Sequence, residues 1–327
     1  MRQEFFNNII DVDQENFHLR ALDIFQYQAK NNLIYKRWID YLGVNLGNVN
    51  EIKDIPFLPV SFFKTEAVVS GNYDSQVVFE SSSTTGSIPS KHFVKDIDLY
   101  RQSFLAGFQQ FYGSPDEWCI IGLLPSYLER KGSSLVLMVD ELIKQSDHSH
   151  SGFYLHNYET LASVLKELEA QKQQTLLIGV TFALLDFADQ FPMKLESTIL
   201  METGGMKGRR KEMIREEVHD FLKKQFDASS VHSEYGMTEL LSQAYSSGNG
   251  IFKSVPWMKV LVREEDNPLK VNIHGRGLIN VIDLANVHSC SFIATDDVGK
   301  VYEDGSFEVL GRMDNSDIRG CGLMVVG

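Results

Sequence analysis

Apolar residues in the first part of the chain follow a helical period. Across residues 13–42 they recur at intervals of four, as at Phe17, Ala21 and Phe25, without an internal proline or glycine. Two prolines in the stretch "DIPFLPVSFFK" interrupt this pattern, and the short β-rich run "SQVVFE" follows. The pattern therefore predicts an aromatic-rich, helical N-terminal cap over residues 1–75.

Residues 76–250 alternate between apolar runs of strand length and amphipathic stretches of helix length. Runs such as "WCIIGLL", "TLLIGV" and "STILMET" predict strands, and "DIDLYRQSFLAGFQQFY", "TLASVLKELEAQ" and "FALLDFADQF" predict helices. The run "SLVLMVDELI" suits either a strand or a helix, and a further helix is expected over residues 211–226. Strands interleaved with helices indicate an α/β core whose sheet is at least partly parallel.

The pattern changes again after residue 250. Residues 251–310 read as short alternating strands separated by turn signals, which predicts a small β-rich subdomain built as an antiparallel sheet or barrel. Residues 311–327 are too few for another domain and are expected to form a short C-terminal tail.

Composition narrows the class of protein. Among 327 residues, 43% are hydrophobic and 23% are charged, which is typical of a globular protein. The formal net charge of −13 argues against a nucleic-acid or anionic-membrane surface, because phosphate binding needs clustered Lys and Arg. Three cysteines without a C-x-x-C pair indicate a reducing compartment, so we expect a cytoplasmic protein. No apolar run approaches the roughly 18 residues of a spanning helix, so no membrane span is expected.

The first candidate site is the run "FESSSTTGSIPSK", in which five successive hydroxyl residues precede a glycine. Ser and Thr side chains, with backbone N–H groups freed by a glycine turn, can form a nest that binds phosphate oxygens. Gly86 is followed by Ser87 rather than by Lys and Ser or Thr, so the run is not a Walker loop. Taken alone, a solvated loop is the simpler interpretation, because the same residues dominate turns.

Further segments give this run a context. In order along the chain, "SSSTTGSIPSK", "METGGMKG", "EYGMTE" and the pair "ATDDVG" and "GRMD" resemble motifs of adenylate-forming enzymes. The matching motifs are the phosphate loop, the glycine-rich adenine loop, Y-G-x-T-E, and the pair T-G-D and G-R-x-D. Within that superfamily, "IPFLPVSFFK", "LLPSYLERKGSSLVLM", "ETGGMKGRR" and "DIRGCGL" resemble the acyl-protein synthetases of the LuxE type, with phenylacetate-CoA ligases as nearest cousins.

The resemblance implies a fold. The chain would form the large N-terminal domain of an adenylate-forming enzyme, an α/β fold with mixed and parallel sheets flanked by helices and a small β-rich subdomain. It would lack the usual C-terminal lid domain.

The resemblance also assigns nucleotide-binding residues. Hydroxyl and backbone donors of the phosphate loop would surround the β- and γ-phosphates of ATP, at Ser82, Ser83, Thr84, Thr85 and Gly86. Gly204 and Gly205 would let the backbone approach the adenine. Tyr235, next to Gly236, would stack on it.

The same resemblance assigns residues to the ribose, to the metal ion and to the cation that assists catalysis. Asp297 would accept hydrogen bonds from the ribose hydroxyls, and Arg312 would add a charged donor to the ribose or the phosphate. Thr238 would hydrogen-bond the α-phosphate, and Glu239 would hold Mg²⁺, a hard cation that prefers carboxylate oxygens. Lys207, in the dense basic cluster "KGRRK", is a candidate for the cation that a lid domain normally supplies, with Lys91, Arg209 and Arg210 as the others. A solvated helix start explains the cluster equally well.

Two positions depart from the family's pattern. Ser83 replaces a glycine of the phosphate loop, which could tighten or alter the loop. Asp296 replaces the glycine of T-G-D and adds a negative charge that ATP would not welcome unless the side chain points away.

A cysteine near the C-terminus is the candidate acyl acceptor. Cys321 lies between two glycines and two residues after Arg319, so its sulfur has small neighbours and a cation that favours the thiolate. Acyl-protein synthetases carry their acylated cysteine in a matching segment. Cys119 and Cys290 lie in apolar strand contexts and are expected to be core thiols.

The expected function is ATP-dependent and Mg²⁺-dependent activation of a carboxylic acid, a fatty acid by resemblance, to acyl-AMP. The acyl group would pass to Cys321 and then to a partner protein that resembles an acyl reductase. One alternative is a ligase that transfers the acyl group to coenzyme A or a small alcohol. A non-catalytic nucleotide-binding subunit of a partner enzyme is an alternative of another class, supported by Ser83 and Asp296.

Overall fold

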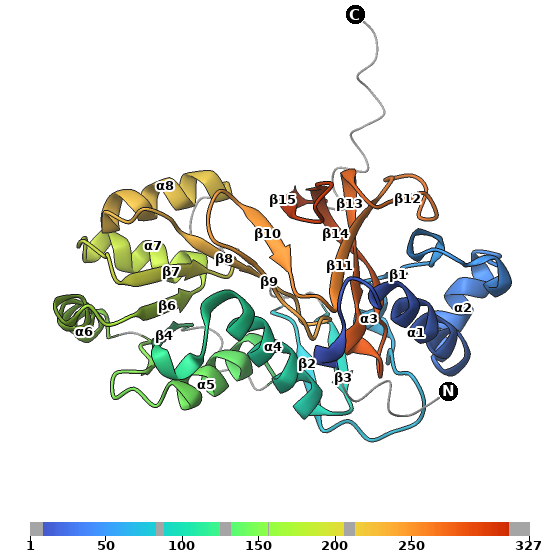
Figure 1. Cartoon of the computed structure of the whole chain (residues 1–327), viewed down its shortest axis with the longest axis horizontal. Helices are drawn as coiled ribbons and strands as arrows, with labels where there is room; N and C mark the ends of the chain where they lie inside the picture. Colours follow the sequence, from blue (N-terminus) through green and yellow to red (C-terminus); the bar gives the residue numbers. More distant parts are fainter. Residues whose placement is uncertain (1–8, 83–87, 125–131, 156, 206–212, 314–327) are drawn as a thin grey trace, which may run out of the picture.

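The computed structural model describes residues 9–82, 88–124, 132–155, 157–205 and 213–313 (Figure 1). Its strands are β1 (Leu58–Pro59), β2 (Val77–Glu80), β3 (Lys91–Val94), β4 (Cys119–Leu123), β5 (Gly152–Phe153), β6 (Thr175–Gly179), β7 (Thr198–Glu202), β8 (His232–Tyr235), β9 (Ala244–Ser246), β10 (Ile251–Ser254), β11 (Met258–Arg263), β12 (Val271–Asn272), β13 (Gly275–Asp283), β14 (Phe292–Val301) and β15 (Phe307–Arg312). Its α-helices are α1 (Phe17–Asn31), α2 (Leu33–Tyr41), α3 (Phe62–Thr65), α4 (Ile97–Tyr112), α5 (Ser134–Ser146), α6 (Tyr158–Gln171), α7 (Thr181–Gln190) and α8 (Arg215–Phe226). Short 3₁₀ turns are η2 (Ile9–Asp11), η3 (Leu46–Asn48), η4 (Ile52–Asp54), η5 (Pro115–Glu117) and η6 (Leu284–Asn286).

The main sheet has a parallel part and an antiparallel part. Within the described residues the order is β12-β11-β13-β14-β15-β10-β9-β8-β7-β6-β4-β5, and β5, β4, β6, β7 and β8 pair in parallel. Strands β4 and β6 are buried at every position, as expected for strands that are covered on both faces. Figure 1 shows α7 and α8 on one side of these strands and α4 and α5 on the other. The predicted α/β core is therefore confirmed, and the ambiguous run "SLVLMVDELI" is helical.

The antiparallel part of the main sheet begins where β8 meets β9. From β9 the pairing continues antiparallel through β10, β15, β14, β13, β11 and β12. This part is the predicted β-rich region, but the strands continue the main sheet instead of closing on themselves. Tyr235 lies on β8 and Asp297 on β14, so candidate nucleotide-binding residues lie on both sides of the junction.

The N-terminal helices pack against the antiparallel part (Figure 1). The helical region predicted from the sequence is divided at Asn32, whose side-chain oxygen accepts a hydrogen bond of 2.9 Å from the N–H of Tyr35 and so starts α2. The Asn32 amide also donates to the carbonyl of Ser289 at 2.9 Å. The Gln28 amide donates to the carbonyl of Asn286, likewise at 2.9 Å. Buried polar side chains therefore fasten these helices to the segment between β13 and β14.

Helix α8 starts later in the chain than the sequence pattern indicates. Helix α8 begins at Arg215 rather than near residue 211, because Ile214 is extended (ψ 157°) and its N–H donates to the Glu217 carboxylate at 3.1 Å. In the part of the chain that the structure describes, no helix is both long and apolar enough to cross a membrane.

Candidate active site

The two strands that flank the phosphate-loop candidates in the sequence, β2 and β3, form a hairpin. Strands β2 and β3 pair from Val77 with Val94 to Glu80 with Lys91. One step further, the N–H of Ser81 donates to the carbonyl of Ser90 at 3.1 Å, and the N–H of Ser90 donates to Oγ of Ser81 at 2.9 Å. Ser82 follows as an exposed residue. The predicted Ser83, Thr84, Thr85 and Gly86 lie outside the described residues.

Thr238 and Glu239 lie on the loop after β8, and buried polar groups hold this loop. The Asn286 amide donates to the carbonyl of Glu239 at 2.8 Å. One carboxylate oxygen of Asp283 accepts from the N–H of Leu241 at 2.8 Å and from the N–H of Ser242 at 3.1 Å. Because Asp283 is fully buried, these charge-assisted bonds fix the loop to the end of β13.

The Glu239 carboxyl lies where several candidate elements meet. The side chain is buried, with 5% of the residue exposed, and burial raises its pKa above the ordinary value. A hydrogen bond from Ser90, at the base of the hairpin, opposes that rise. The positive charges of Arg312 and Lys64 also favour the ionised form. The structure thus brings Ser90, at the base of the predicted phosphate loop, and the predicted metal ligand together.

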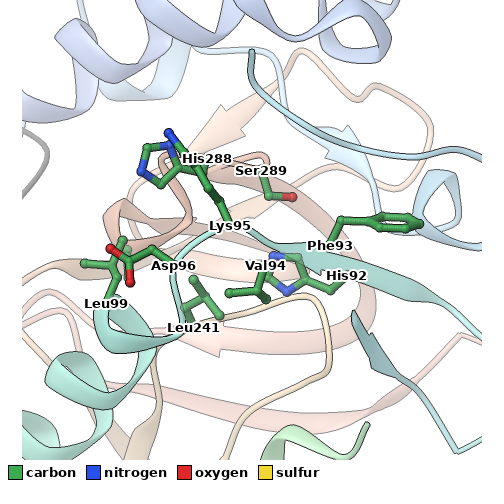
Figure 2. A pocket seen from close by; sticks show the side chains of 10 residues that line it. His92, Phe93, Val94, Lys95, Asp96, Leu99, Leu241, His288 and Ser289 are labelled. Atoms are coloured by element: carbon green, nitrogen blue, oxygen red, sulfur yellow. The ribbon is translucent and has the colours of Figure 1, made fainter. Parts of the chain in front are cut away.

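His92 on β3 fixes the preceding residue of the loop. Its Nδ1 lies 2.9 Å from the carbonyl of Thr238, and a carbonyl only accepts, so Nδ1 carries the proton. Burial lowers the pKa of His92 to about 4, so the ring is neutral near pH 7. Figure 2 shows His92 with Leu241 and His288 around a small cavity of about 10 Å³. That volume suits one water molecule and excludes a substrate.

Tyr235, Asp297 and Arg312 form a second group. The Tyr235 hydroxyl donates to Oδ2 of Asp297 at 2.9 Å, and Nε of Arg312 lies 3.9 Å from Oδ1. Residues Asp297 and Arg312 are opposite each other in the β14–β15 pair. Burial raises the pKa of Asp297, whereas the Arg312 charge and the Tyr235 hydrogen bond oppose the rise. The carboxylate of Asp296 lies 3.8 Å from Arg312, which partly balances the extra negative charge noted in the sequence.

The glycine loop follows β7, the strand next to β8. Gly204 and Gly205 have backbone φ angles of 77° and 94°, which residues other than glycine rarely adopt. The N–H of Gly204 donates to the Glu202 carboxylate at 3.0 Å, and its carbonyl accepts from the N–H of Thr181 at 3.0 Å. The loop is therefore held at both backbone groups of Gly204. Lys207, Arg209 and Arg210 lie outside the described residues.

Glu202 is a functional candidate that the sequence reasoning missed. Its carboxylate accepts from the hydroxyls of Thr181 at 2.9 Å and Ser233 at 3.1 Å. Arg215 Nε lies 3.4 Å away and His219 Nε2 3.6 Å away. Burial opposes ionisation, but His219, Arg215 and Thr181 together lower the pKa of Glu202 to about 2. The only signal in the sequence is an acidic residue that ends the apolar run "STILMET" before two glycines.

Arg215 connects this carboxylate to the antiparallel part of the sheet. Its NH1 group donates to the carbonyl of Val309 on β15 at 3.0 Å, and its guanidinium lies 5.0 Å from the centre of the Phe252 ring. The Tyr235 and Phe252 rings meet edge to face, with centroids 5.9 Å apart. Glu202 and Arg215 thus link the glycine loop to Tyr235 and to the strand that carries Arg312.

The lysine and cysteine candidates have different environments. Lys91 forms an exposed ion pair with Glu80 at 3.5 Å, so its charge is already partnered.

Cys119 and Cys290 are both fully buried, and burial raises their pKa to about 11 and about 12. These two thiols therefore stay protonated near pH 7, as expected for core residues. Cys321 lies outside the described residues.

The fold is that of adenylate-forming enzymes. The chain superposes with a TM-score of 0.65 on 2-hydroxyisobutyryl-CoA ligase in the postadenylation state in complex with R3-HIB-AMP, at 12% identity, over 92% of this chain and 68% of the ligase. It superposes with a TM-score of 0.53 on ATP-bound MatB from Rhodopseudomonas palustris, at 18% identity, over 75% of this chain and 49% of MatB. The chain thus matches about half the length of MatB.

The family follows from the sequence as a whole. The model of the LuxE acyl-protein synthetase family matches residues 9–326, and the chain belongs to this family. A relative in Vibrio harveyi, named long-chain-fatty-acid–luciferin-component ligase, is 23% identical over 324 residues, which is 91% of this chain and 84% of the relative. The family and this relative indicate an adenylate-forming ligase, and the resemblance inferred from the motifs is confirmed.

Proposed function

We propose that the protein activates a fatty acid with ATP and Mg²⁺ to form acyl-AMP, and then passes the acyl group through Cys321 to a partner protein. The observation that carries the proposal is the environment of Glu239. Ser90 at the base of the phosphate loop and Arg312 beside Asp297 both act on this one carboxyl group. The residue that precedes β3, the residue proposed for the metal and a residue proposed for the ribose or the phosphate therefore support a single site.

The groups around Glu239 suit a magnesium nucleotide. A carboxylate beside a hydroxyl, with a cation nearby, provides oxygen donors for a hard cation and positive charge for phosphate oxygens. Mg²⁺ bound there would neutralise part of the phosphate charge. Asp297 would accept from the ribose hydroxyls in place of the Tyr235 hydroxyl, and the glycine loop would border the adenine.

The proposed activation is an in-line displacement. A carboxylate oxygen of the fatty acid attacks the α-phosphorus, and the bond from that phosphorus to the bridging oxygen of the β-phosphate breaks. Pyrophosphate leaves with the electron pair, and acyl-AMP remains. In the proposed transfer, the Cys321 thiolate attacks the acyl carbonyl and AMP departs, giving a thioester.

Acid-dependent exchange between ATP and pyrophosphate tests the activation step. We expect exchange with Mg²⁺ and fatty acids of at least one chain length, because reversal of the step returns labelled pyrophosphate to ATP. Without acid no acyl-AMP forms, so we expect no exchange. ATP binding without exchange for any acid, even with the partner present, would contradict the proposal and favour a nucleotide-binding subunit.

Cys321→Ser tests the transfer step. The variant should lose hydroxylamine-labile acyl labelling almost completely while it keeps the exchange activity of the unchanged protein, because an alcohol replaces the thiolate nucleophile. Labelling is measured with a radioactive fatty acid, and Cys119→Ser serves as control because Cys119 is buried. Equal labelling of the two variants would place the acceptor elsewhere, and coenzyme A consumption would indicate a different acceptor.

A further inference from the structure

Lys64 lies on helix α3, which is held against the sheet that carries Asp297. Strand β1, just before the helix, pairs in parallel with β14, with Leu58 opposite Ile293. The N–H of Val60 then donates to the carbonyl of Ala294 at 2.9 Å. This attachment point is three residues before Asp297. The position of α3 relative to the candidate ribose site is therefore set by backbone pairing.

The residue before Lys64 fixes the helix against the loop of Glu239. Phe63 is 1% exposed, and its ring meets the ring of His92 edge-on with centroids 5.8 Å apart. His92 in turn donates to the carbonyl of Thr238, next to Glu239. A continuous series of contacts thus runs from α3 through β3 to the loop. Lys64 follows Phe63 directly and is exposed.

Lys64 differs from Lys91 and Arg312 in having no carboxylate partner among the described residues. Lys91 pairs with Glu80, and Arg312 lies near both Asp296 and Asp297. Within the described part of the chain, the Lys64 ammonium has no carboxylate within ion-pair distance. An exposed ammonium without a carboxylate partner, on the helix that Phe63 and His92 fasten to the loop of Glu239, is suited to bind an anion.

We propose that the Lys64 ammonium binds the phosphate chain of ATP beside Glu239 and offsets the negative charge that builds on the α-phosphoryl oxygens during attack. The claim that Lys64 stabilises charge during attack rests on the proposed function, whereas the claim that Lys64 binds the phosphates of ATP does not depend on it. Lys64 would then be a further catalytic residue, from the stretch "IPFLPVSFFK".

Three variants test the proposal. Lys64→Ala removes the charge, Lys64→Arg keeps it, and Lys36→Ala on α2 is a control that removes an exposed lysine elsewhere. Affinity for MgATP without acid is measured by titration calorimetry, and exchange between ATP and pyrophosphate is measured with acid. We expect Lys64→Ala to bind MgATP about tenfold more weakly and to exchange about a hundredfold more slowly. Lys64→Arg should recover most of both, and Lys36→Ala should match the unchanged protein.

The outcomes separate this proposal from the proposed function. Equal MgATP affinity and equal exchange for Lys64→Ala and Lys36→Ala would overturn the role of Lys64. Absence of exchange in the unchanged protein would overturn the adenylation proposal alone, because MgATP affinity still tests Lys64. A Lys64→Ala variant that melts at the same temperature as the unchanged protein excludes a merely structural cause, and a lack of recovery in Lys64→Arg would contradict a role for charge.

Discussion

Glu202→Gln should lower the free energy of unfolding by about 3 kcal/mol, because it leaves Arg215 and His219 beside a neutral amide in a buried setting. It should also weaken MgATP binding about tenfold, because the Glu202 carboxylate accepts the N–H of Gly204 and holds the glycine loop. Unfolding in urea gives the first quantity, and titration calorimetry gives the second.

Glu196→Gln is the matched control for this prediction. Glu196 lies just before β7, its side chain is 71% exposed, and it pairs with Lys194 at 2.8 Å. Exposed pairs contribute little to stability, so this variant should unfold like the unchanged protein. If both variants behaved alike, the buried network around Glu202 would not hold the loop as we infer.

Glu234→Gln should stabilise the protein, and increasingly so as the pH rises. Burial, with a smaller effect from the charge of Glu202, raises the pKa of Glu234 from 4.5 to about 8. Between these values the folded protein keeps a proton that the unfolded chain has lost, so stability falls as the pH rises toward 8. Glutamine has no proton to lose. Each pKa unit corresponds to about 1.4 kcal/mol, so the gain should reach a few kcal/mol at pH 8 and shrink toward pH 5.

The neighbours of Glu234 on strands β8 and β9 do not offset the rise in its pKa. Glu234 lies opposite Tyr245 in the β8–β9 pair, and the Tyr245 hydroxyl is buried without a partner among the described residues. On the same face of β8, the hydroxyl of Tyr112 lies 3.1 Å from Nδ1 of His232. No positive side chain in this group favours an ionised Glu234.

Urea unfolding at several pH values between 5 and 8 measures the prediction for Glu234→Gln. Glu265→Gln, at an exposed position, should leave the pH dependence of stability unchanged. A constant difference between Glu234→Gln and the unchanged protein across this range would show that Glu234 does not carry the proton.

Local patterns were sufficient to predict the main elements of the fold. Long amphipathic stretches such as 97–112 and buried apolar runs such as 175–179 form the helices and strands that their periods indicate. The order of the motifs also identified the family. The structure places Tyr235, Asp297 and Arg312 in contact although two of them lie more than 60 residues from the first.

Other features depend on contacts that no local pattern contains. Strand β3 has four residues, among them Lys91 and His92, and is defined by its pairing with β2 rather than by its composition. The groups that hold Glu202 come from α7, α8 and β8, so its role emerges only when these elements meet. Asp283 and Asn286 hold the Glu239 loop from more than 40 residues away for the same reason.

The attachment of the N-terminal helices has a consequence for protein synthesis. The bonds from Gln28 to Asn286 and from Asn32 to Ser289 span 258 and 257 residues. A ribosome must therefore make nearly the whole described chain before the partners of these side chains exist. Until then the apolar surface that Phe25 and Tyr35 bury against Phe292 has no native partner. The nascent chain therefore depends on shielding from aggregation at this surface, and docking of its first helices on the sheet is a late event in folding.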